Sequence, residues 1–343
     1  MKFKHILTLL LALLIMSYVS SSVEAGPRSK LGTSAAPELL IPIGSVGTSL
    51  GGSNLSTSTG VEAIYWNPAG ISELGTTSEV MFSHMNYIAD IDMQFLGVAA
   101  QVGNLGVIGA SIRSLNIGEI RQTTEYLPEG TGTFFNPTYI VAGVSFARKM
   151  TDKIRFGTNI NVISQNVGNV SSSGVAFDFG LQYVGGNTGF TFGIALKNLG
   201  PSMTFDGPGL DRSFTENGLA TTRRVILQSF DLPTNLEIGV GYLWDLDHQN
   251  KVNVTGAFQN SSFSSDEYRF GLEYNFNNNF FVRGSYSIFA DKETDESLFG
   301  PSFGAGLRYP FGSVTLAFDY AYRVITESAF NSTNQFFTLK VGF

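Results

Sequence analysis

The sequence predicts an all-β protein, a 14-stranded antiparallel transmembrane β-barrel with an N-terminal hatch or plug segment in or under its lumen. Three observations predict this fold. Apolar and polar residues alternate along many segments, several of these segments run to ten or more residues, and the last of them ends on an aromatic residue. Alternation at period two gives a strand one apolar and one polar face. A sandwich strand typically has about five or six residues, whereas a tilted membrane-spanning strand needs about nine to eleven.

The N-terminus has the pattern of a secretory signal peptide. Lys2 and Lys4 precede an apolar run, and small residues follow it up to Ala25. The run is shorter than the roughly 20 residues that a membrane-spanning helix needs. We therefore expect residues 1–25 to be cleaved and the mature protein to reach the outer membrane of a Gram-negative-type bacterium.

Residues 26–77 differ from the rest of the chain. Most of this stretch is rich in Gly, Ser and Thr and lacks the period of two. We expect it to form the hatch, with Tyr65 and Trp66 packed against the inner wall, or else a cap that closes one end. Asn67 is expected to begin a turn in which Gly70 adopts a positive φ.

Residues 78–343 carry the barrel. Their number of predicted strands is even, as in single-chain bacterial barrels. The predicted strands are 78–88, 92–102, 105–116, 137–149, 153–166, 172–184, 188–198, 234–245, 250–261, 266–276, 279–289, 301–309, 313–324 and 333–343.

Short turns alternate with longer connections between these strands. The long connections, residues 117–136, 199–233 and 290–300, are expected to form outer loops. Residues 223–227 are predicted to form a small strand of their own within the second loop. The charged run at 291–296 is expected to be a solvated loop tip rather than a cation site.

Charged residues fall in the middle of several predicted strands, always on the polar face. They are Arg155, Arg269, Glu273, Arg283 and Asp319. A wet lumen would accept such side chains, whereas a lipid-facing surface would not.

The last strand places four apolar residues on one face. They are Phe337, Leu339, Val341 and Phe343. An unpaired apolar edge invites aggregation, but in a closed barrel this strand pairs with the first and its apolar face meets lipid. We expect these residues to form the C-terminal signal that the barrel-assembly machinery recognises.

Several functions are not indicated by the sequence. The net charge of −7 argues against a nucleic-acid partner. His84 and His248 lie far apart, and we find no nucleophile elbow, P-loop or zinc-protease motif. We therefore predict no enzyme, no catalytic residue, no metal site and no cofactor. The predicted partners are outer-membrane lipid and the assembly machinery.

One stretch of the predicted hatch resembles a known family. Gly51-Gly52 followed by the run from Ala63 to Ile71 resembles the N-terminal signature of the PorV/PorQ family, which belongs with the FadL-like fourteen-stranded barrels. The residues that carry this hatch motif are Gly51, Gly52, Tyr65, Trp66, Asn67, Pro68, Ala69 and Gly70.

The resemblance implies two kinds of function. PorV-type members serve type IX secretion by binding the C-terminal domain of a cargo protein and passing it to secretion-system partners. FadL-type barrels move hydrophobic small molecules across the outer membrane. We expect the secretion role first and the transport role as its alternative, whereas a plugged lumen argues against a general porin.

Overall fold

The computed structural model describes residues 32–343, with the exception of residues 90, 217–218, 291–297 and 327–332. The expected signal peptide and the charged run at 291–296 lie outside the described residues.

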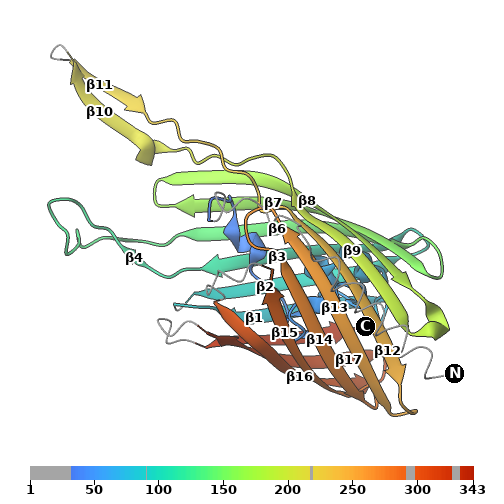
Figure 1. Ribbon diagram of the computed structural model, residues 1–343. Helices are drawn as coiled ribbons and strands as arrows, with labels where there is room; N and C mark the ends of the chain where they lie inside the picture. The colour runs from blue at the N-terminus through green and yellow to red at the C-terminus, as the bar shows by residue number, and fades with distance from the viewer. Residues whose placement is uncertain (1–31, 90, 217–218, 291–297, 327–332) are drawn as a thin grey trace.

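Fourteen antiparallel strands close into a barrel, and the first strand pairs with the last (Figure 1). This confirms the predicted fold class. Each strand end lies within two residues of its predicted position. The strands are β1 (Ser78–Asn86), β2 (Asp92–Val102), β3 (Gly106–Asn116), β6 (Thr138–Lys149), β7 (Ile154–Val167), β8 (Val170–Val184), β9 (Phe190–Leu199), β12 (Asn235–Asp245), β13 (Asn250–Ser261), β14 (Glu267–Phe276), β15 (Phe280–Phe289), β16 (Phe299–Phe311), β17 (Val314–Ile325) and β18 (Asn334–Gly342).

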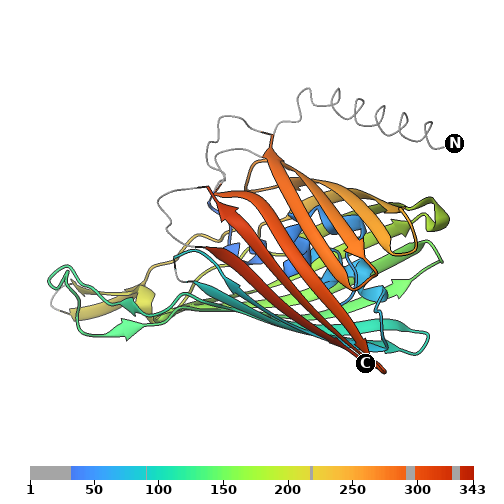
Figure 2. The ribbon, with the colours of Figure 1, turned by 90° about the horizontal axis from the view of Figure 1, so that it is seen from below.

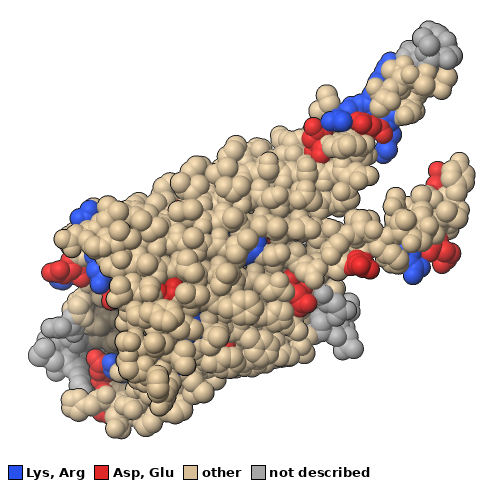
Figure 3. All heavy atoms as spheres, turned by 180° about the vertical axis from the view of Figure 1, so that it is seen from behind, with Lys and Arg blue, Asp and Glu red and all other residues tan. Residues whose placement is uncertain are grey.

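The outer face of the barrel is apolar. Phe337, Leu339 and Phe343 of the last strand are 37%, 46% and 53% exposed, as the alternation predicts. Figure 3 shows that most charged residues on the visible side lie toward the two ends and on projecting loops. Such a belt is the surface that a barrel presents to lipid.

The two ends of the barrel differ. Short turns such as residues 103–105 and 312–313 join strands at one end, which we call the turn end. Long connections emerge at the other, the loop end. Two hairpins project there beyond the rim (Figures 1 and 2). They are formed by β4 (Ile120–Arg121) with β5 (Phe134–Phe135), and by β10 (Asp211–Glu216) with β11 (Leu219–Arg224).

The small strand predicted at residues 223–227 was misplaced. β11 ends at Arg224, because its partner β10 begins at Asp211 and the register pairs these two residues. Val225 therefore has no ladder to continue, and the chain leaves the hairpin as irregular structure.

Residues 32–77 lie inside the barrel (Figure 2), and we call them the luminal segment. They fold into five short helices, since glycines and prolines interrupt every longer run. None of the described helices is long and apolar enough to cross a membrane. The helices are η2 (Pro37–Leu40), α2 (Ser45–Ser49), η3 (Ser53–Ser56), α3 (Ala63–Trp66) and η4 (Pro68–Ser72).

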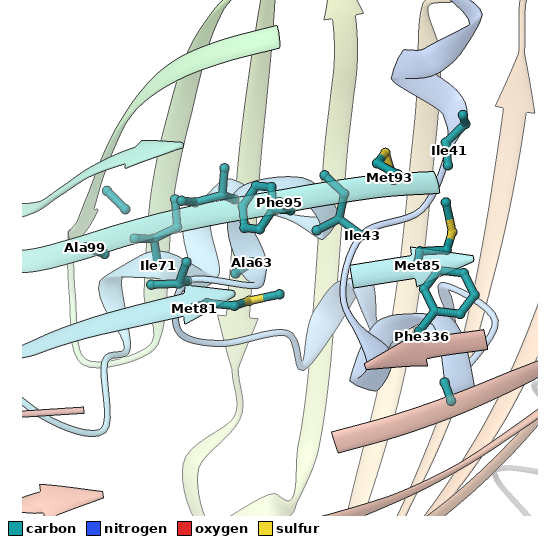
Figure 4. Packing of buried hydrophobic residues seen from close by; sticks show 14 of the residues in the cluster. Ile41, Ile43, Ala63, Ile71, Met81, Met85, Met93, Phe95, Ala99 and Phe336 are labelled. Carbon is teal, nitrogen blue, oxygen red and sulfur yellow. The ribbon is translucent and has the colours of Figure 1, made fainter. Parts of the chain in front are cut away.

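The main hydrophobic core lies within the lumen, between this segment and the inner faces of β1 and β2. Met85, Met93 and Phe95 point inward and are at most 3% exposed. They pack with Ile41 and Ile43 of the luminal segment (Figure 4).

Candidate functional site

The luminal segment packs directly against glycines of the inner wall. A Cβ at Gly157 of β7 would lie only 2.5 Å from the backbone nitrogen of Ala69. A Cβ at Gly180 of β8 would lie 2.8 Å from Cδ of Pro68. Real Cβ atoms essentially never come as close as 3.0 Å to another heavy atom. These two glycines therefore let the backbone of η4 touch the backbone of the wall.

Asn67 fastens this contact with its side-chain amide. Its Nδ2 donates to the carbonyl oxygens of Leu55 at 3.0 Å, of Leu181 at 3.2 Å and of Ile194 at 3.4 Å. Its Oδ1 accepts from the backbone nitrogen of Ala69 at 3.1 Å and caps η4. Because Asn67 is fully buried, losing these bonds would leave polar groups unsatisfied.

Three glycines of the hatch motif serve close packing. Gly51 and Gly52 both have positive φ, and a Cβ at Gly52 would lie 2.7 Å from the ring of Trp66. The positive φ predicted for Gly70 was wrong, because Gly70 is not among the positive-φ residues. Glycine is required there because a Cβ would collide with the carbonyl oxygen of Ser58.

Tyr65 and Trp66 stack edge to face, with ring centroids 4.8 Å apart. Trp66 Nε1 donates to the carbonyl oxygen of Ile43 at 3.0 Å. Lys197 of β9 places its Nζ 4.6 Å from the Tyr65 ring centroid and 2.9 Å from Glu237 Oε1 of β12. Tyr65 and Trp66 thus contact both the buried Lys197 of the wall and the backbone of the luminal segment at Ile43.

The charges predicted for the lumen have specific partners. Arg155 Nη2 lies 2.7 Å from Glu73 of the luminal segment. Arg283 bridges Glu273 and Asp319, at 2.5 Å and 2.7 Å. Sequence alternation indicated the side of the strand but not these pairings, which join different strands or join the segment to the wall.

A small cavity of about 30 Å³ lies beside the apolar core. Apolar side chains dominate one side of it, including Ile43, Ile64 and Phe95, and Arg113 and Lys197 approach from the wall. Arg113 is only 8% exposed. Among the described residues, its Nη1 is one of the few buried side-chain atoms without a hydrogen-bond partner. Sequence reasoning did not single out Arg113.

His84 and His248 lie in different parts of the described structure. Nε2 of His84 lies 3.9 Å from Asp92 on the neighbouring strand, and His248 lies in a turn between β12 and β13. Within the described ranges, no group of three or more His, Asp or Glu residues is arranged to hold a metal ion.

Solved structures of other proteins have a fold similar to that of this chain. No family model matches the chain, and no curated protein matches its sequence. The solved structure of the CymD monoaromatic hydrocarbon channel superposes with a TM-score of 0.52 at 12% identity, covering 88% of this chain and 97% of that one. This chain has the FadL-like barrel fold.

Two further structures agree with this fold. The Pseudomonas putida toluene transporter TodX has a TM-score of 0.51 at 13% identity, covering 87% of this chain and 96% of its own. A Pseudomonas aeruginosa FadL homologue has a TM-score of 0.50 at 10% identity, covering 87% and 97%. None of these matches supports the narrower resemblance to the PorV/PorQ family.

Proposed function

We propose that this protein is an outer-membrane channel through which hydrophobic small molecules cross. The observation that carries the proposal is the apolar half of the lumen, formed by the inner faces of β1 and β2 against the luminal segment. The FadL-like fold supports it, since solved proteins of this fold include a hydrocarbon channel and a toluene transporter.

The apolar half suits guests of varied shape. Met81, Met85 and Met93 line it, and methionine side chains are flexible and polarisable, so that they adapt to irregular surfaces. Met85 and Met93 face each other across β1 and β2 near the loop end. A hydrophobic molecule entering from that end would reach these residues after passing the partly buried Tyr87 and Ile91, which pack against the same cluster.

The small cavity is a site for water and not for a guest, because its volume of about 30 Å³ has room for about one water molecule. Arg113 offers there a buried guanidinium with an unpartnered Nη1. A buried donor without a partner is costly, and a water molecule would satisfy it. We therefore propose that the channel accepts mainly apolar molecules.

Uptake of radiolabelled toluene tests the transport proposal. A strain lacking the gene should take up toluene more slowly, and the wild-type gene should restore the rate. Met93→Glu places a charge in the apolar half and should abolish this rescue. Ser302→Glu is the matched control, because Ser302 is equally buried at 3% but lies on β16, in the polar part of the inner wall. Equal uptake with and without the gene would refute the proposal.

A role in protein secretion is the second candidate. The observation that favours it is the pair of projecting hairpins at the loop end. Tyr126, on the first hairpin, is 89% exposed, and Ile226, just after the second, is 94% exposed.

Quantitative comparison of secreted and surface proteins in the wild type and the deletion strain tests this second role. Accumulation in the periplasm of proteins that share one C-terminal domain would support it. An unchanged set of secreted proteins would remove it and leave the transport proposal unaffected.

A further inference from the structure

The lumen has a second, polar half that the hydrophobic route does not use. It is formed by the inner faces of β14 to β18, next to the methionine-bearing strands, because β18 pairs with β1. Charged and amide side chains occur along this wall on both sides of its middle. Toward the turn end they are Glu273, Arg283, Asp319 and Lys340, and toward the loop end they are Glu267, Arg269, Arg323 and Asn334.

A cavity of about 410 Å³ separates the luminal segment from this wall at the turn end. Five carboxylates and three basic side chains line it. Asn54 of the segment also lines it, is 3% exposed and has an Oδ1 without a hydrogen-bond partner. The lining carboxylates are Glu62, Glu73, Glu79, Glu273 and Asp319, and the basic residues are Arg283, Arg308 and Lys340.

The short helix α2 separates this cavity from the polar residues nearer the loop end. Ser45 donates from its backbone nitrogen to Thr338 at 3.0 Å, and Ser49 abuts Gly304. In the barrel register Thr338 is level with Asp319, and Gly304 is level with Ala321. Helix α2 therefore meets the wall between the two polar groups. Its side chains there are small, and Trp66 of α3 packs against its Gly47.

An ion pair ties this barrier to the wall in addition to the Ser45–Thr338 hydrogen bonds. Glu62 accepts from the backbone nitrogen of Gly47 in α2 at 2.8 Å through Oε1, and pairs with Nζ of Lys340 through Oε2. Lys340 also lies 3.8 Å from Asp319. On the η4 side, the segment is held by backbone contact and by the two bonds of Asn67 to wall carbonyls. Helix α2 is held near Gly47 by this ion pair and at Ser45 by the bonds to Thr338. Loss of the Glu62–Lys340 pair would therefore loosen α2 from the wall while η4 stays fixed.

We propose that the polar half is a second passage, for small hydrophilic solutes, which α2 closes and the Glu62–Lys340 ion pair keeps closed. The excess of carboxylates in the cavity lining gives the open passage a preference for cations. This passage runs along β14 to β18, beside the apolar route along β1 and β2.

Ion conductance of the purified full chain in planar lipid bilayers tests the passage. Wild-type protein should be mostly closed to potassium chloride. Lys340→Met and Glu62→Gln should each raise the open probability at least about tenfold, the factor expected for losing a charge-assisted hydrogen bond. A salt gradient should give a reversal potential that shows selection for potassium over chloride, and Glu79→Gln in the Lys340→Met background should weaken it.

Lys149→Met is the matched control. Lys149 also pairs with a glutamate of the luminal segment, since its Nζ lies 2.8 Å from Glu73, but on the side where η4 rests on glycine. Arg155 pairs with the same carboxylate, so the control should stay closed. If Lys340→Met and Glu62→Gln conduct no more than this control while all migrate as folded barrels, the proposed gate is refuted.

Cysteine labelling tests the route itself, because the natural chain has no cysteine. Ala317 lines the cavity and is 8% exposed. In the Lys340→Met background, Ala317→Cys should react with a charged methanethiosulfonate reagent and lose most of the current. A current that selects anions, or that persists after complete labelling, would overturn the route. Toluene uptake should be unchanged in Lys340→Met, which separates this passage from the hydrophobic channel.

Discussion

Replacing Gly157 by alanine should loosen the luminal segment from the wall. The new methyl group would lie 2.2 Å from the carbonyl oxygen of Pro68 and 2.5 Å from the nitrogen of Ala69. Both neighbours are backbone atoms, so no side-chain rotation can relieve the collision. Overpacking of this kind costs about 1–3 kcal/mol.

The shift of the segment adds a second cost. Asn67 would lose its bonds to the carbonyl oxygens of Leu181 and Ile194, each of which contributes about 0.5–1.5 kcal/mol. We therefore expect Gly157→Ala to weaken docking of the segment by about 2–6 kcal/mol, the sum of these two contributions.

Hydrogen exchange of the folded barrel in detergent measures this docking. Amides of residues 63–72 should exchange much faster in Gly157→Ala than in the wild type, while those of the strands stay protected. Gly256→Ala is the control, because a Cβ there would lie 3.8 Å from its nearest neighbour. Gly256→Ala replaces a glycine without causing a collision, so docking of the luminal segment should be unchanged in this variant. If both variants show the same exchange over residues 63–72, the backbone contact does not hold the segment.

Three further predictions follow from the charges and the C-terminus. Lys197→Met should destabilise the barrel in guanidinium unfolding by up to about 3–5 kcal/mol, because the buried Glu237 keeps only the more distant Arg269, at 3.9 Å, and Glu237→Leu in the same chain should restore stability. A hydrogen bond from Arg224 lowers the pKa of Asp211 on the projecting hairpin. The stabilisation by this ion pair is therefore fully present above the ordinary pKa of about 3.9 and is lost as pH falls through the lowered pKa. Pepsin should therefore cut the β10–β11 hairpin faster only at the acid end of its range, whereas Asp211→Asn should be cut faster already near about pH 5. Phe343→Ser should lower the amount of folded barrel in the outer membrane, measured by heat-modifiable migration on gels, and an unchanged yield would contradict the assembly role of this strand.

The strands could be predicted closely from the sequence because their signal is local. Alternation along β14 or β18 shows at each position which side chain faces lipid, and it needs no knowledge of the neighbouring strands. The same alternation placed Arg283 and Asp319 in the lumen. It could not pair them, because they lie on β15 and β17, and their side chains meet across the intervening strand β16.

The luminal site was predicted in outline only. The change in composition before residue 78 indicated a distinct segment, and the run from Tyr65 to Gly70 marked its centre. The part of the inner wall against which the segment packs was not predicted. Glycines on the polar face of strands, such as Gly157 and Gly180, indicate a close approach of another backbone. Their significance depends on η4 lying opposite them, which no local pattern states.

The sequence by itself determined a closed barrel of alternating strands, because side-chain direction in a strand follows from period two and closure removes the exposed edges. Only the tertiary structure decided how the lumen is divided into an apolar half and a polar half. That division depends on contacts between residues far apart in the chain. Asn67 binds the carbonyl of Leu181, and Glu62 pairs with Lys340, 278 positions away. Such contacts are set by the register in which the barrel closes around the segment, and a linear pattern does not contain that register.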